Sequence, residues 1–173
     1  MSDLQFEQVA NIKVFGIGGG GRKAGDPMVS EGVKGVEFYV ANTDLQALNI
    51  SPVENKIVLG REVTKGLGAG ANPEMGRRAA QENENEIREA IKGSDMVFIT
   101  TGLGGGTGTG AAPMFAKIAK EEGALTVGIV TKPFTFEGKK RMNSAEDGLA
   151  ELKQYVDSLI IVSNNNLIEV IGR

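Results

Sequence analysis

Short apolar runs alternate along this chain with stretches of helical periodicity. The apolar runs are a few residues long and rich in Val and Ile, which is typical of strands buried on both faces of a sheet. They predict strands at residues 12–17, 36–41, 57–59, 96–100, 125–130 and 159–162.

Between these runs, apolar residues recur every three or four positions, as they do on one face of a helix. This spacing predicts helices over residues 75–91, around residues 114–119 and over residues 145–156. Strands that alternate with helices predict a Rossmann-like, doubly wound α/β fold. We expect a mostly parallel six-stranded sheet with helices on both faces, in an order such as 3-2-1-4-5-6.

Composition narrows the class of protein. The 173 residues suffice for one globular domain, and the net charge of −3 gives no reason to expect nucleic acid or a membrane surface as a partner. The chain has no Cys and no His, which excludes thiolate or imidazole metal sites and a histidine base, whereas Mg²⁺ held by oxygen atoms stays possible. No apolar stretch approaches the ~20 residues of a membrane span, so we expect a cytoplasmic protein.

Loops that are nearly free of side chains follow several predicted strands. In doubly wound sheets, ligands bind beyond the carboxyl ends of the strands, where these loops lie. One loop joins the fourth predicted strand to a helix and consists of Gly104, Gly105, Gly106, Thr107, Gly108, Thr109 and Gly110. Backbone N–H groups at such a helix start can bind phosphate. Thr107 and Thr109 either donate hydroxyl groups or cap the helix, and we expect at least one of them to cap it.

A second pattern suggests a different cofactor. Gly16-x-Gly18-x-x-Gly21, followed by Asp44 after the second predicted strand, matches the dinucleotide fingerprint of NAD enzymes. Consecutive glycines match this pattern easily, and an NAD site leaves the glycine-rich loops at 66–71 and 104–110 unexplained. An NAD-dependent oxidoreductase is therefore an alternative hypothesis.

Four segments together resemble the tubulin/FtsZ family of GTPases. GGGTGTG at residues 104–110 is similar to the family's signature loop, and NTD at 42–44, GLGAGANP at 66–73 and KPFTFEG at 132–138 follow the family's order and spacing. The resemblance covers about residues 12–172. It implies the nucleotide-binding domain of a filament-forming cell-division GTPase that binds GTP or GDP, with Mg²⁺ accompanying GTP.

The resemblance also implies roles for particular residues. Glu137 and Arg141 would hold the ribose side, and Asn164 would read the guanine edge. Asn42, Asp44 and Pro133 belong to the matched segments and are expected in the nucleotide site. The residues expected to surround the phosphates are Gly19, Gly20, Gly21, Ala69, Gly70, Ala71, Gly104, Gly105, Gly106, Thr107, Gly108 and Thr109. The resemblance implies that Ala69, Gly70 and Ala71 lie near the γ-phosphate, and that Gly106, Thr107 and Gly108 lie at the α- and β-phosphates.

The first loop departs from the family pattern. Lys23 stands where the family places an Asn that contacts nucleotide, and Lys23 either meets a phosphate as a point charge or points to solvent. We expect residues 1–11 to be a flexible leader and residues 12–173 to be the GTP-binding domain, ending as a helix begins after the sixth strand.

The family's central helix and second domain lie outside this sequence. That second domain carries an acidic loop that completes the active site of the neighbouring subunit. We therefore expect no catalytic residue in this chain, nucleotide binding with little hydrolysis, and self-association through the nucleotide face. The alternative is a non-catalytic module that caps or modulates filaments.

Overall fold

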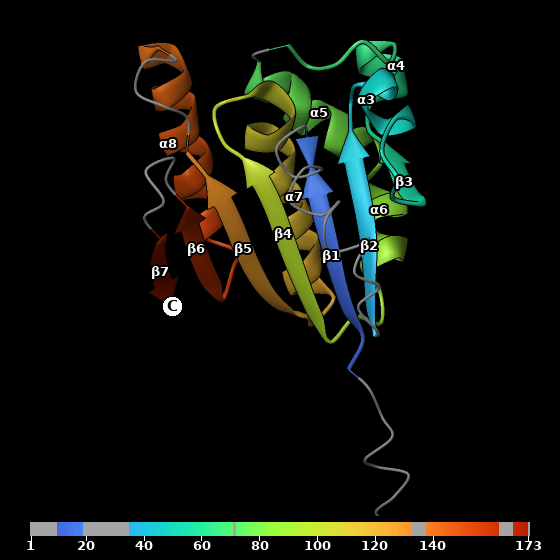
Figure 1. The fold of residues 1–173 in the computed structure, drawn as a ribbon, viewed down its shortest axis with the longest axis vertical. Coiled ribbons are helices and arrows are strands. Elements are labelled where there is room, and N and C mark those ends of the chain that lie inside the picture. Colours follow the sequence, from blue (N-terminus) through green and yellow to red (C-terminus); the bar gives the residue numbers. More distant parts are fainter. Residues whose placement is uncertain (1–9, 19–34, 71, 133–137, 163–167, 173) are drawn as a thin grey trace, which may run out of the picture.

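A single sheet organises the chain (Figure 1). The computed structural model describes residues 10–18, 35–70, 72–132, 138–162 and 168–172. The seven strands follow the order β3-β2-β1-β4-β5-β6-β7 across the sheet. The strands are β1 (Ile12–Ile17), β2 (Val36–Asn42), β3 (Asn55–Val58), β4 (Met96–Gly102), β5 (Leu125–Thr131), β6 (Ser158–Val162) and β7 (Ile168–Gly172).

The parallel part of the sheet confirms the predicted order. Strands β1 to β6 pair in parallel, with Ile12 opposite both Val36 of β2 and Met96 of β4. All six predicted strands are present, with ends that differ by up to two residues. Their carboxyl ends therefore meet along one edge, the upper edge in Figure 1.

Strand β7 corrects the expectation of a helix after the sixth strand. It pairs antiparallel with β6, from Ser158 opposite Gly172 to Val162 opposite Ile168. The segment is rich in β-branched residues, which favour extended backbone. The outer edge of β6 offers unpaired backbone groups that such a segment can satisfy.

The helices are α3 (Leu45–Asn49), α4 (Arg61–Thr64), α5 (Pro73–Glu82), α6 (Glu84–Ile91), α7 (Gly106–Glu121) and α8 (Lys139–Lys153). The helix predicted over residues 75–91 is divided at Asn83, whose φ of −108° and ψ of 23° leave the helical region. The Asn83 Oδ1 atom accepts a hydrogen bond from Gly60 N at 2.8 Å. This contact with a distant loop favours the break.

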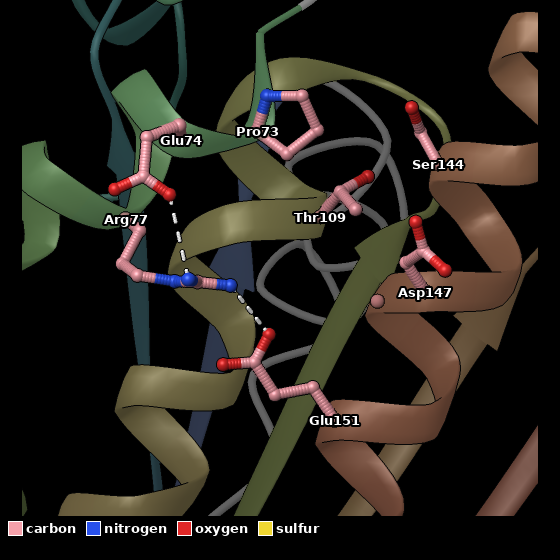
Figure 2. A pocket seen from close by; sticks show the side chains of 8 residues that line it. Pro73, Glu74, Arg77, Thr109, Ser144, Asp147 and Glu151 are labelled. Carbon is pink, nitrogen blue, oxygen red and sulfur yellow. Dashed lines mark hydrogen bonds and ion pairs between the residues drawn. The ribbon is translucent and has the colours of Figure 1, made fainter.

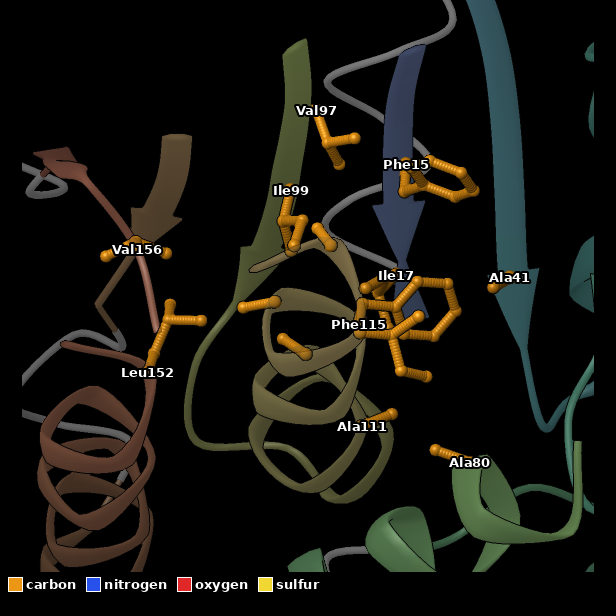
Figure 3. Close-up of a cluster of buried hydrophobic side chains, with 14 of the residues drawn as sticks. Phe15, Ile17, Ala41, Ala80, Val97, Ile99, Ala111, Phe115, Leu152 and Val156 are labelled. Atoms are coloured by element: carbon orange, nitrogen blue, oxygen red, sulfur yellow. The ribbon is translucent and has the colours of Figure 1, made fainter. Parts of the chain in front are cut away.

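Buried side chains pack on both faces of the sheet. On one face, α5 to α8 cover a core that includes Phe15, Ile99 and Phe115 (Figure 3). The Phe15 ring stacks on Tyr39 at 4.8 Å and meets Phe115 at 5.6 Å. On the other face, Leu48 of α3 packs in a cluster with Val14, Phe38, Val40 and Val53, which confirms helices on both faces.

Candidate functional site

The first turn of α7 lies at the carboxyl edge of the sheet, directly after β4. Its N-cap residue is Gly105, which makes no side-chain capping bond. The first N–H groups of an α-helix have no partner within the helix, so the backbone of Gly106, Thr107 and Gly108 presents donors at this edge. A helix start of this kind favours negatively charged ligands.

Neither threonine caps α7, so the expected capping role is wrong. The Thr109 Oγ1 atom instead accepts a hydrogen bond from Gly104 N at 2.8 Å, which closes the loop back onto the helix. The Thr107 hydroxyl lies 2.6 Å from that of Thr43, at the carboxyl end of β2. These buried hydroxyl groups hold the loop in shape.

Several glycines of the loop are required by packing. A Cβ at Gly106 would lie 2.6 Å from Gly70 O, and a Cβ at Gly108 would lie 2.8 Å from Gly102 O. A Cβ at Gly110 would lie 2.6 Å from Arg77 N on α5. Real side chains do not tolerate such distances to backbone atoms. These glycines therefore allow β4, α5 and α7 to approach closely, and the sequence pattern alone could not separate this role from ligand binding.

Gly105 differs from those glycines. Its φ of −85° suits any residue, and among the described residues the nearest atom to an added Cβ would be Arg141 Nη2 at 3.8 Å. Arg141 lies in the first turn of α8, so the structure brings this predicted ribose contact to the glycine-rich loop.

Residues 66–70 form a second wall next to α7. Gly66, Gly68 and Gly70 have φ values of 80°, 95° and 62°, a region that glycine adopts readily. The Leu45 N–H donates to Gly66 O at 3.2 Å and ties this loop to the start of α3. Ala69 is buried, and its Cβ would lie 3.0 Å from a Cβ added at Gly106.

Asn42 and Asp44 use their side chains within their own loop. The Asn42 Oδ1 atom accepts hydrogen bonds from the backbone N–H groups of Thr43 and Asp44, at 2.8 and 3.2 Å. The Asp44 Oδ1 atom caps α3 by accepting from Gln46 N and Ala47 N. Both residues lie at the expected edge, and their contact with nucleotide stays a prediction.

Other expected contacts fall outside the described part of the chain. These residues are Gly19, Gly20, Gly21, Lys23, Ala71, Pro133, Glu137 and Asn164.

Sequence reasoning gave no specific role to Thr43 or Asn72, whereas Gly18 was part of the dinucleotide fingerprint. The hydroxyl groups of Thr43 and Thr107 are hydrogen-bonded to each other. A Cβ added at Gly18 would lie 3.4 Å from Gly108 N, so the two backbones are in close contact. Asn72 caps α5 by accepting from Glu74 N at 3.0 Å. The dipeptide Asn72-Pro73 carried this last signal, because Asn is favoured at an N-cap and Pro at the first helical position.

A pocket of about 140 Å³ lies beside this edge, among α5, α7 and α8 (Figure 2). Its lining includes Thr109 and three carboxylates, those of Glu74, Asp147 and Glu151. Arg77 forms ion pairs with Glu74 and Glu151 there. The pocket is thus separate from the donors of α7, although it shares Thr109 with that helix.

The described residues contain neither a metal-binding cluster of acidic side chains nor a membrane-spanning helix. No group of three or more acidic side chains in those residues could hold a metal ion. None of the helices in the described ranges is long and apolar enough to cross a membrane.

Comparison with known proteins decides the family. The model of the Tubulin/FtsZ family, GTPase domain, matches residues 11–172. The chain belongs to this family. The matched range includes the glycine-rich loops at 66–71 and 104–110, which an NAD site left unexplained. The oxidoreductase alternative is therefore not favoured.

Individual relatives agree with this assignment. The chain is 60% identical over 170 residues to the cell division protein FtsZ of Buchnera aphidicola subsp. Baizongia pistaciae, a match that covers 98% of the chain and 44% of that protein. Among solved structures, it is similar to an empty FtsZ dimer of M. jannaschii, with a TM-score of 0.90, 48% identity, and coverage of 94% of this chain and 47% of the other. It is also similar to CetZ2 from Haloferax volcanii in a GTPγS-bound protofilament, with a TM-score of 0.82, 25% identity, and coverage of 90% and 49%. The chain spans about half the length of these relatives.

Proposed function

We propose that this chain binds GTP and GDP at the carboxyl edge of its sheet, as the nucleotide-binding domain of a cell-division GTPase. The proposal rests on the first turn of α7, where Gly106, Thr107 and Gly108 present backbone donors. This turn lies beside the loop at 66–70 and beside Thr43 at the end of β2. Preorganised N–H groups stabilise phosphate charge without reorganisation. Membership of the Tubulin/FtsZ family supports guanine as the base.

Mg²⁺ would accompany GTP rather than occupy a protein-built site. The described residues contain no cluster of acidic side chains for it, and Mg²⁺ at nucleotide sites is held largely by phosphate oxygens and water. The donors of α7 and the Arg141 guanidinium would complement the remaining negative charge. The bound metal would supply further charge neutralisation at the phosphates.

Thermal-shift measurements with GTP, GDP and NAD test the ligand class. A ligand that binds the folded state at about 100 times its Kd stabilises the fold by about 2.7 kcal/mol. We expect GTP and GDP to raise the melting temperature and NAD to leave it unchanged. A shift with NAD alone would overturn the proposal.

Gly105→Ala tests the location of the site. The added methyl group meets no close contact among the described residues, so the melting temperature of the nucleotide-free chain should stay near that of the parent. The same methyl group enters the space in front of α7 and should weaken GTP binding. Unchanged GTP affinity would place the phosphates elsewhere.

We further propose that GTP turnover by this chain alone is low, because hydrolysis requires an acidic loop from a second domain of an adjacent subunit. A phosphate-release assay on the pure chain would test this, and turnover equal to that of a full-length family member would refute it. Such a role fits a cytoplasmic protein.

Contact with a second subunit through the same edge is supported by Leu67. This side chain is 85% exposed between Gly66 and Gly68. A large apolar side chain exposed beside a ligand edge suits a protein contact. The chain could then cap filaments of an intact relative, as the alternative function requires. We expect the added parent chain to shorten such filaments, as measured by sedimentation, and the Leu67→Asp variant to leave them unchanged. Equal shortening by the parent chain and by the variant would contradict this contact.

A further inference from the structure

One ion-paired arginine joins two helices that carry different walls of the candidate site. The Arg77 Nη2 atom of α5 lies 2.7 Å from Glu151 Oε2 of α8, and its Nη1 atom lies 3.4 Å from Glu74 Oε2 (Figure 2). Helix α5, with its N-cap at Asn72, follows the loop at 66–70 in the chain, and α8 carries Arg141 in its first turn. The bridge therefore links the two segments expected at the γ-phosphate and at the ribose.

We propose that Arg77 is a positioning residue that fixes the loop at 66–70 relative to the start of α8 and so sets the preference for GTP over GDP. This inference rests on the proposed guanine-nucleotide function. Arg77 acts through the helices and touches no ligand itself.

The packing beneath the bridge explains how it could act at a distance. Gly76, next to Arg77, faces the backbone of Gly106 and Thr107 on α7. Gly148 of α8 lies less than one helical turn before Glu151 and faces Thr109 of α7. Helices α5 and α8 thus close on the first turns of α7, and the ion pair holds them together. Packed backbone transmits displacement well because protein interiors are hardly compressible.

Stability alone does not account for this arginine. Its Nε atom is buried and has no hydrogen-bond partner among the described residues. A buried donor without an acceptor lowers stability, and an apolar side chain of similar length would avoid that cost. The side chains of Arg77 and Glu151 are 36% and 33% exposed, so solvent only partly screens their attraction.

A second arginine provides a matched control. Arg88 of α6 forms ion pairs with Glu84, Glu121 and Glu122, the last two at the C-terminal end of α7. It has the same chemistry and joins neighbouring helices, yet it lies at the end of the helices opposite to the candidate site. Loss of this network should lower stability without changing nucleotide preference.

Two measurements on the complete chain test the proposal. Titration gives the Kd for GTP and GDP, and hydrogen exchange reports the mobility of residues 66–70 without nucleotide. We expect Arg77→Ala to weaken GTP binding by about fivefold, the lower range of typical site-to-site coupling, with a smaller effect on GDP. The same variant should speed amide exchange in residues 66–70, and Arg88→Ala should change neither readout.

Two further variants guard against a folding defect. Glu151→Gln removes the charge partner while leaving Arg77 in place, and it should reproduce the changed ratio of GTP to GDP affinity. The exchange of charges in Arg77→Glu with Glu151→Arg, made together with Glu74→Gln to avoid repulsion by the Glu74 carboxylate, should restore much of that ratio. A purely structural role would lower stability in all variants without moving the ratio.

The outcomes separate this proposal from the proposed function. Parent-like affinity ratios and parent-like exchange in Arg77→Ala would overturn the positioning role, as would equal effects of Arg88→Ala. If the parent chain binds no guanine nucleotide, the proposed function fails, and with it the claim about nucleotide preference. Faster exchange in residues 66–70 of Arg77→Ala would then still support the mechanical link.

Discussion

Gly110→Ala tests the close packing of α5 against α7. The added Cβ would overlap the carbonyl oxygen of Pro73 and lie 2.6 Å from Arg77 N, whereas ordinary contact begins at 3.4 Å, so the backbone of α5 must move away from α7. A gap of about 0.5–1 Å forfeits a quarter to a half of the dispersion energy at an interface. Overpacking of a core costs about 1–3 kcal/mol, and we expect the upper end because the obstacle is backbone.

Helix propensity works in the opposite direction. Replacement of Gly by Ala inside a helix contributes about 1 kcal/mol of stability. The net loss for Gly110→Ala should therefore be about 2 kcal/mol, or roughly 4–8 °C in melting temperature for a domain of this size. Urea unfolding followed by circular dichroism would measure the loss.

Two controls isolate the steric effect. Ala150→Gly, at an exposed position of α8, calibrates helix propensity. Gly148→Ala places a Cβ 2.6 Å from Thr109 Cγ2, which is a side-chain atom and not backbone, so the loss should be smaller than at Gly110, although displacement of Thr109 strains its hydrogen bond from Gly104 N. A Gly110→Ala variant as stable as the parent would refute the reasoning, because helix propensity would then outweigh the contact with α5.

Three further predictions concern other features. Asp44→Ala should lower stability by about 1 kcal/mol through loss of the α3 cap, and Asp44→Asn should restore it in the same urea titration. Lys65→Gly should raise the urea midpoint modestly, because Lys65 has a φ of 60° and a left-handed residue other than glycine costs roughly 1–2 kcal/mol. Burial, with a smaller effect of the Glu37 carboxylate, raises the pKa of the Tyr39 hydroxyl in the folded chain. The contribution of Tyr39 to folding stability is therefore complete below the pKa of the unfolded chain and is lost as the pH rises through the pKa of the folded chain. Absorbance titration should show one tyrosine ionising later in the folded chain than in urea.

The sheet was the most predictable part of the fold. Strands such as β1, which is buried on both faces from Val14 to Ile17, are identified by their short apolar runs without knowledge of their neighbours. The break at Asn83 was not predictable, because it depends on the N–H of Gly60, which is distant in sequence. Strand β7 was missed because a short apolar run suits helix or strand equally, and pairing with β6 decides between them.

The sequence predicted where the candidate site lies better than it predicted what each of its polar side chains does. Glycine-rich loops after parallel strands located the carboxyl edge, and the structure brings Gly70, Gly106 and Arg141 to it. The role of each polar side chain depended on partners far along the chain. Thr107 bonds to Thr43, and Asp44 caps its own helix, which no spacing pattern could distinguish from ligand contact.

The glycines of the loop at 104–110 serve two requirements within one sequence motif. Some allow the backbone to pack closely, and Gly105 leaves space for a ligand. In a saturation scan that scores both cellular abundance and ligand binding, substitutions at Gly106, Gly108 and Gly110 should lower both scores together, since they displace backbone. Substitution of Gly105 by alanine should lower the binding score alone, since the part of the chain that the structure describes leaves room for its methyl group. The difference between the two scores would then map the ligand-facing surface of the loop residue by residue.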